Sequence, residues 1–278
     1  KISLEMYMDK PKKLALVFDM DETLGYFTQI AIFIDWIEMF ITNPSNKKEK
    51  KLTNEQIFEL FDLFPEIFRP GVFHTIDFIK KQKKKKPYLR LMIYTNNMGP
   101  KSWAHIVRKY IEKKMGQKLL FDRTICAWKV GNLQYEKCRT THMKTYEDLK
   151  KCGNLGDNDK ICFFDDAFHP LMEHSNVDYH RNNKYKTFIP TSLFLSRLSE
   201  TEKVKGLIKN FNAFRDYALK KSREKWYISE DNKNNNKMKY SKLDFLRKVR
   251  SFIKENKLKL SKKRKKKRLN ETKKKLMK

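Results

Sequence analysis

The chain has 278 residues, of which 40% are hydrophobic, and this content excludes an intrinsically disordered protein because it can fill a sizeable core. The formal net charge is +30, and residues 201–278 alone hold 29 Lys and Arg against 8 Asp and Glu. The most apolar long stretch, 30–41, is too short to span a bilayer and contains two acids, so we expect a soluble protein with no membrane partner.

Four cysteines are spread along the chain without a Cys-x-x-Cys pair or a histidine at metal-ligand spacing. They are Cys126, Cys138, Cys152 and Cys162. This pattern predicts reduced, buried thiols, and together with the lack of a visible signal peptide it predicts an intracellular protein.

The first predicted strand, residues 14–18, is a short apolar run typical of a buried parallel strand, and Asp19 and Asp21 follow it directly. Open α/β sheets bind ligands at the carboxyl ends of their strands. Asp-x-Asp alone would be explained by an acidic turn after the strand. The longer pattern Asp-x-Asp-x-Thr directly after a buried strand favours a catalytic role for these residues. Asp19 can attack phosphorus as a nucleophile while Asp21 protonates the departing oxygen and a divalent cation neutralises charge. We expect Thr23 to orient Asp21 through its hydroxyl, and the motif predicts a phosphate-transfer enzyme.

A small, mainly helical insert beside this motif is predicted over residues from about 25 to 69. Apolar residues recur at helical spacing over 26–40, and Thr53 with Gln56 makes a capping-box pattern that opens a second helix through residue 64. We expect the Phe and Trp side chains of the insert to pack internally instead of contacting substrate.

The second predicted strand, 89–94, follows an amphipathic helix over 71–81 and a lysine run at 83–86 that predicts a solvated turn. The strand ends in Thr95 and Asn96. A threonine at this point can offer its hydroxyl and backbone amide to a phosphate oxygen, although a lone threonine here is more often a helix cap.

A helix over 101–115, ended by Gly116, and a strand over 121–127 come next. Residues 142–149 then open another helix, with Lys144 near its start. One lysine among 63 basic residues carries little weight by itself, so its significance depends on the other motifs.

Asp165 and Asp166 directly follow the strand predicted over 161–164. Adjacent carboxylates repel each other unless a cation or a lysine lies between them. His169 and His174 raise zinc as an alternative, but a set of carboxylate oxygens favours Mg²⁺ and leaves the histidines with a structural role. A last strand and its connection are predicted over 177–190.

Taken in order, these motifs resemble those of the haloacid dehalogenase-like superfamily, in its phosphatase branch. Within that branch the chain is similar to the RNA polymerase II C-terminal-domain phosphatases, also called NLI-interacting-factor-like phosphatases. The resemblance covers roughly residues 10–195. The matching strings are Phe-Asp-Met-Asp-Glu-Thr-Leu at 18–24, Arg-Pro-Gly-Val at 69–72, Tyr-Thr-Asn-Asn at 94–97, the helix start containing Lys144, and Phe-Asp-Asp-Ala-Phe-His at 164–169.

This resemblance implies a three-layer Rossmann-like α/β fold with a central parallel sheet, and a role for each motif. Asp19 would be the nucleophile that forms an aspartyl-phosphate, and Asp21 would be the acid and then the base. Thr95, with Asn96 beside it, would bind the phosphoryl group that Lys144 neutralises. Mg²⁺ would be held by Asp19, the backbone carbonyl of Asp21 and the pair Asp165 and Asp166. Within this pair, Asp166 is expected to be the direct ligand, and Asp165 is expected to orient Lys144 or water.

Three departures limit what the resemblance implies about substrate. The family usually reaches Arg-Pro-Gly through short strands, whereas the insert here is helical and aromatic. Asn96 and Asn97 replace a small Ala-Ser-type pair, and the turn near Gly131 is altered. We therefore expect this chain to share the reaction class of the family, but we do not extend the family's peptide specificity to it.

We therefore expect a Mg²⁺-dependent phosphomonoesterase acting on phosphoserine or phosphothreonine in a protein or peptide. The alternatives are a nucleic-acid end (3′-)phosphatase, which a basic surface favours, and a catalytically idle binding scaffold.

Residues 1–200 are predicted to form the phosphatase domain, and 201–278 a basic extension with helices over 202–222 and 241–257. Seven consecutive basic residues at 262–268 fit a solvated terminus, a nuclear localisation signal, or attachment to nucleic acid or an acidic phosphorylated substrate.

Overall fold

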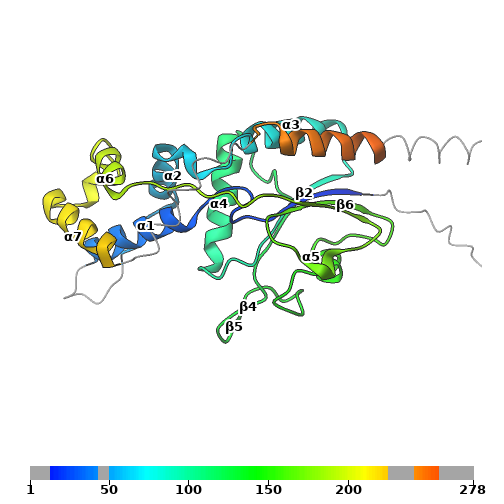
Figure 1. Ribbon diagram of the computed structural model, residues 1–278, viewed down its shortest axis with the longest axis horizontal. Coiled ribbons are helices and arrows are strands. Elements are labelled where there is room, and N and C mark those ends of the chain that lie inside the picture. Colours follow the sequence, from blue (N-terminus) through cyan, green and yellow to red (C-terminus); the bar gives the residue numbers. More distant parts are fainter. Residues whose placement is uncertain (1–12, 43–49, 225–240, 257–278) are drawn as a thin grey trace, which may run out of the picture.

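A parallel five-stranded sheet forms the centre of the computed structural model, which describes residues 13–42, 50–224 and 241–256 (Figure 1). Its strands are β1 (Leu14–Phe18), β2 (Leu89–Tyr94), β3 (Arg123–Ile125), β6 (Lys160–Asp165) and β7 (Val177–Arg181). The spatial order β3-β2-β1-β6-β7 places β1 and β6 on either side of the point where the direction of winding reverses. The predicted α/β class is confirmed. A small hairpin of β4 (Lys129–Val130) and β5 (Leu133–Gln134) lies outside this sheet.

Helices surround the sheet and also form a cluster at one end of the molecule (Figure 1). They are α1 (Thr28–Ile41), α2 (Asn54–Leu63), α3 (Val72–Lys85), α4 (Lys101–Lys114), α5 (Tyr146–Cys152), α6 (Thr191–Ser199), α7 (Phe211–Glu224) and a helix over residues 244–256. Short 3-10 turns occur at Pro65–Ile67, Pro170–Met172 and Lys205–Leu207.

The alternation of side chains along β1 divides the core into two parts. Leu14, Leu16 and Phe18 face a cluster that includes buried residues of α3, α4 and the helix over 244–256. Ala15 and Val17 face the other side, where α5 packs. Because successive side chains of a strand point to opposite faces, a fully apolar strand is covered on both, and the result is three layers.

The predicted insert is helical, and it packs against the chain that follows the sheet. Thr53 and Gln56 form both bonds of the predicted capping box at the start of α2. The ring of Phe33 in α1 stacks on Phe194 in α6 with centroids 4.0 Å apart. The aromatic side chains of the insert therefore pack internally, as expected, and their partners include α6 and α7 (Figure 1).

The helix over 244–256 lies beside α3 and covers the sheet (Figure 1). Gly71, at the start of α3, has φ +87°, and a Cβ added there would lie 1.9 Å from the carbonyl oxygen of Lys242, so the two backbones approach closely. Part of the predicted extension thus contributes to the core of the preceding region. The division at residue 200 stays a prediction, and the basic run at 262–268 lies outside the described residues.

The predicted turn at 83–86 is wrong, because α3 continues through Lys85. Lysines in the last turn of a helix are favoured by the helix dipole. Lys80 and Lys83 also donate hydrogen bonds to the carbonyl oxygens of Met115 (2.9 Å) and Leu120 (2.7 Å). The lysine run is therefore a helix end tied to the chain after α4.

The prediction of four reduced cysteines is also wrong. Cys138 and Cys152 form a disulfide, whereas Cys126 and Cys162 are buried and take no part in one. Two cysteines 14 residues apart pair because the chain folds back from the segment after β5 onto the end of α5. In the described parts of the chain, no helix has the length and apolar character needed to cross a membrane.

Candidate active site

The register between β1 and β6 places Asp19 beside Asp165. Phe18 pairs with Phe164, and the backbone amide of Asp19 donates to the carbonyl of Phe164 over 2.8 Å. Both strands end here, so both carboxylates emerge at the point where the winding reverses.

Lys144 lies between these two carboxylates. Its Nζ donates to Oδ1 of Asp19 and, over 2.7 Å, to Oδ2 of Asp165. Thr145 caps α5 by accepting a hydrogen bond from the amide of Asp148, so Lys144 stands just before the helix. Three side chains from distant parts of the sequence therefore meet, as the motifs predicted.

This group is buried, and it contains more carboxyl groups than ammonium groups. Asp19, Lys144 and Asp165 are 6%, 2% and 1% exposed, and Asp166 adds a third carboxylate within 4.8 Å of the other two. Burial raises the pKa of Asp19 well above its usual range and raises that of Asp166. Although burial alone would lower it, the pKa of Lys144 is raised by the two carboxylates, which keeps the lysine charged. One ammonium against three carboxylates leaves room for a cation, and oxygen ligands of this kind suit Mg²⁺.

Asp165 and Asp166 have different surroundings. Both oxygens of Asp165 are engaged, by Lys144, by the amide of Ala167 at 2.9 Å and by His169 at 3.3 Å. Asp166 accepts one hydrogen bond from Thr23 at 3.2 Å and lies 3.9 Å from the exposed Lys184. The expectation that Thr23 orients Asp21 is therefore wrong, because its hydroxyl reaches across to the end of β6.

Asp21 is instead held by Asn97. The side-chain amide of Asn97 donates to Oδ2 of Asp21 over 2.8 Å, and the backbone amide of Asn97 donates to the hydroxyl of Thr95 over 3.0 Å. Burial raises the pKa of Asp21 to about 6, although the bond from Asn97 opposes this. In a fraction of the molecules this carboxyl is therefore protonated near neutral pH, the form that a general acid requires. Sequence reasoning named Asn96 and missed Asn97, because position along the chain does not show which amide turns toward Asp21.

The loop that carries Asp21 is fixed by Arg69. Its guanidinium donates to the carbonyls of Glu22, Thr23 and Asn183, each over 2.6 Å. Glu22 has φ +57°, a left-handed conformation that costs energy for a residue with a side chain. The Arg-Pro-Gly string thus stabilises a strained loop beside the carboxylates.

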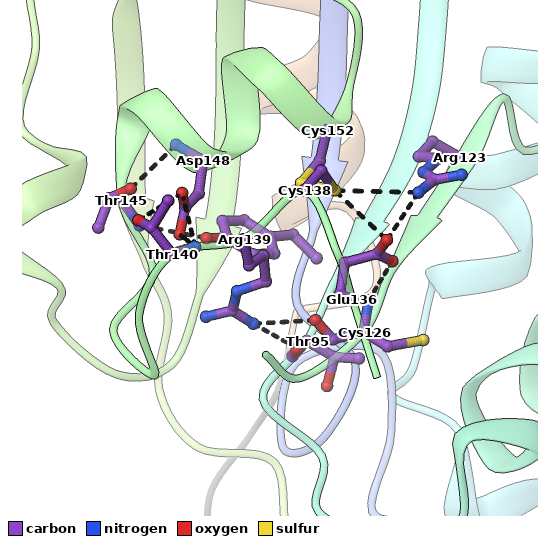
Figure 2. Close-up of a disulfide and its surroundings, with 11 residues drawn as sticks. Thr95, Arg123, Cys126, Glu136, Cys138, Arg139, Thr140, Thr145, Asp148 and Cys152 are labelled. Carbon is purple, nitrogen blue, oxygen red and sulfur yellow. Dashed lines mark hydrogen bonds and ion pairs between the residues drawn. A yellow bond between two sulfur atoms is a disulfide. The ribbon is translucent and has the colours of Figure 1, made fainter. Parts of the chain in front are cut away.

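Asn96 and Thr95 lie close to a second buried arginine, Arg139. Oδ1 of Asn96 accepts a hydrogen bond from Arg139 over 2.8 Å. The carbonyl of Thr95 accepts another over 3.3 Å (Figure 2). The predicted roles of Thr95 and Asn96 in binding a phosphoryl group stay predictions. Arg139 itself was missed, since nothing distinguishes it in sequence from the other basic residues.

No protein-family model and no curated protein sequence matches this chain. Among solved structures, it is similar to the HAD domain of the effector protein Lem4 from Legionella pneumophila, with a TM-score of 0.37 and 13% identity over 69% of this chain and 97% of that chain.

Proposed function

We propose that this protein is a Mg²⁺-dependent phosphomonoesterase of the haloacid dehalogenase-like superfamily that works through an aspartyl-phosphate. The observation that carries the proposal is the position of Lys144 between Asp19 and Asp165, at the carboxyl ends of β1 and β6, with Asp21 two residues away on the same loop. An ammonium next to a candidate carboxylate nucleophile can neutralise an incoming phosphoryl group.

The reaction would have two steps. An oxygen of Asp19 attacks phosphorus, the bond from phosphorus to the substrate oxygen breaks, and the carboxyl of Asp21 gives its proton to that oxygen. Asp21, now a carboxylate, takes a proton from water, whose oxygen attacks the same phosphorus. The bond to Asp19 breaks, inorganic phosphate leaves, and both carboxyl groups return to their starting forms. Asn97 keeps Asp21 in place for both proton transfers.

The residues fit a Mg²⁺ ion that would neutralise charge on the phosphoryl oxygens when bound. Asp19, the backbone carbonyl of Asp21 and Asp166 would hold it. Asp166 is a better candidate than Asp165, because both oxygens of Asp165 already have partners on Lys144, Ala167 and His169.

The substrate class we propose is phosphoserine or phosphothreonine in a protein. The support is the resemblance of the motifs at 18–24, 69–72 and 164–169 to the C-terminal-domain phosphatases. The same chemistry would serve a nucleic-acid 3′-phosphate, and the net charge of +30 favours such a substrate, so this stays the second candidate.

The test is phosphate release from para-nitrophenyl phosphate, a phosphoserine peptide and a 3′-phosphorylated oligonucleotide, each with Mg²⁺ or EDTA. Metal-dependent turnover that is lost in Asp19→Asn and kept in Asp216→Asn, a change at an exposed aspartate, is the expected result. Faster turnover of the oligonucleotide than of the peptide would reverse the substrate proposal. No turnover of any of the three by folded, metal-loaded protein would point to the idle scaffold.

A further inference from the structure

Arg139 connects three segments that converge on the candidate site. Its side chain is buried, and its two terminal nitrogens donate five hydrogen bonds. Figure 2 shows Arg139 beside two of the acceptor residues, Thr95 and Cys126. The acceptors are the carbonyl of Thr95 (3.3 Å), Oδ1 of Asn96 (2.8 Å), and the carbonyls of Cys126 (2.9 Å), His142 (3.1 Å) and Met143 (3.0 Å). Of these acceptors, two directly follow β2, one directly follows β3, and two directly precede Lys144.

The hydrogen-bond acceptors around the guanidinium of Arg139 are uncharged groups. All five acceptors are neutral, and within the described ranges no ion pair joins its guanidinium to a carboxylate. Burying a guanidinium without an ionic partner is costly, and burial lowers the pKa of Arg139 accordingly. What the residue provides is geometry, because a planar fork of donors can reach several carbonyls at once and an ammonium cannot. The guanidinium also lies over the ring of Tyr94, 4.9 Å from its centroid.

The backbone around Arg139 is itself fixed on both sides. Cys138 is bonded to Cys152 at the end of α5, and the amide and hydroxyl of Thr140 donate to the carboxylate of Asp148 over 2.9 to 3.1 Å (Figure 2). The side chain of Arg139 therefore extends from a segment attached to α5 and holds the ends of β2 and β3 in place.

We infer that Arg139 is a positioning residue, which sets the distance between Thr95 and Lys144 without touching substrate. The inference rests on the proposed function, in which Thr95 binds the phosphoryl group and Lys144 neutralises it. Without Arg139, the turn at residues 142 and 143 loses its bonds to the segment after β2, and the two phosphate-binding groups no longer keep a fixed spacing. Misplacing a catalytic group by about 1 Å can lower a rate about 100-fold.

The test compares Arg139→Met and Arg139→Lys with Arg123→Met, which removes a partly exposed arginine paired with Glu136 in the same region. Well below the melting temperature of each protein, kcat for para-nitrophenyl phosphate should fall about 100-fold in Arg139→Met. Arg139→Lys should restore little of it, because one ammonium cannot reach all three segments. Arg123→Met should stay within about threefold of the unmodified protein.

A second measurement separates positioning from general support of the fold. In Arg139→Ala, added guanidinium ion at millimolar concentration should raise kcat in a saturable way, whereas ammonium ion should not. A folded Arg139→Met protein with kcat within twofold of the unmodified protein would overturn the inference, and so would rescue by ammonium as effective as rescue by guanidinium.

The inference can fail separately from the proposed function. If the unmodified protein hydrolyses no phosphomonoester, calorimetric titration with inorganic phosphate and Mg²⁺ becomes the readout. Weaker phosphate binding in Arg139→Met than in Arg123→Met would then still support the positioning role, and equal binding would overturn it.

Discussion

The ring of Phe245 packs against that of Phe18, with centroids 5.7 Å apart, and so joins a helix near the end of the chain to the first strand of the sheet. Phe245 is 4% exposed, whereas Leu243, two residues earlier, is 50% exposed. Phe245→Ala should therefore lower the free energy of unfolding by about 3 to 5 kcal/mol, because it leaves a cavity over β1. Leu243→Ala should change it by less than about 0.5 kcal/mol. Urea denaturation monitored by circular dichroism measures both, and equal effects would mean that this helix does not pack on the sheet.

Metal binding should be visible as stabilisation. If Mg²⁺ is held by Asp19 and Asp166, its addition at about 100 times the dissociation constant should stabilise the folded protein by about 2.7 kcal/mol. The melting temperature should rise by several degrees over its value in EDTA. Asp166→Asn should lose this rise, and Glu173→Gln, at an exposed residue on the same loop, should keep it. A full rise in Asp166→Asn would exclude Asp166 as a ligand.

The disulfide should contribute to stability by restricting the unfolded chain. Cys138 and Cys152 close a loop of about 15 residues, for which the expected stabilisation is about 3 kcal/mol. Cys138→Ser, or a reductant added to the unmodified protein, should lower the urea midpoint. As the control, reductant should cause no further change in Cys138→Ser, which lacks the bond. Identical midpoints with and without reductant would show that this bond does not stabilise the fold.

Acid should weaken the packing of His180. Burial lowers the pKa of this histidine, which lies 3.2 Å from Asp178, with Lys248 and Asp244 also near it. The histidine of the unfolded chain therefore binds a proton more tightly than that of the folded protein. The stability that the neutral, packed His180 contributes is complete above about pH 6.5, the pKa of an unfolded histidine, and is lost as pH falls through the lower pKa of the folded protein. The melting temperature of the unmodified protein should fall more steeply below that pH than that of His180→Gln. His74→Gln, at an exposed histidine, is the control, and parallel curves for unmodified protein and His180→Gln would contradict the expectation.

The parts of the fold that local patterns encode could be predicted from the sequence. An apolar run that ends in aspartate predicted β1 and β6, and because both are parallel strands it also predicted that Asp19 and Asp165 would meet. The capping box at Thr53 depends on residues three apart, and it too could be predicted.

Features that depend on distant partners could not be predicted. The acceptors of Arg139 are mostly backbone carbonyls, which every residue possesses, so no residue type signals them. The pairing of Cys138 with Cys152 depends on the direction of their Cβ atoms, which spacing alone does not determine. Asn97 was missed and Thr23 was misassigned for a related reason, since the turns after β1 and β2 decide which neighbour each side chain reaches.

Identification of the phosphorylated residue tests whether Asp19 is the nucleophile. Asp21→Asn, which lacks the base that activates water, is incubated with para-nitrophenyl phosphate and Mg²⁺ and quenched in acid, and its peptides are analysed by mass spectrometry. We expect the mass of one added phosphoryl group on the peptide that contains Asp19, and none when Asp19→Asn is combined with Asp21→Asn. A phosphoryl group on another residue, or no phosphorylated peptide while the unmodified protein turns the substrate over, would show that catalysis does not pass through a phosphoryl group on Asp19.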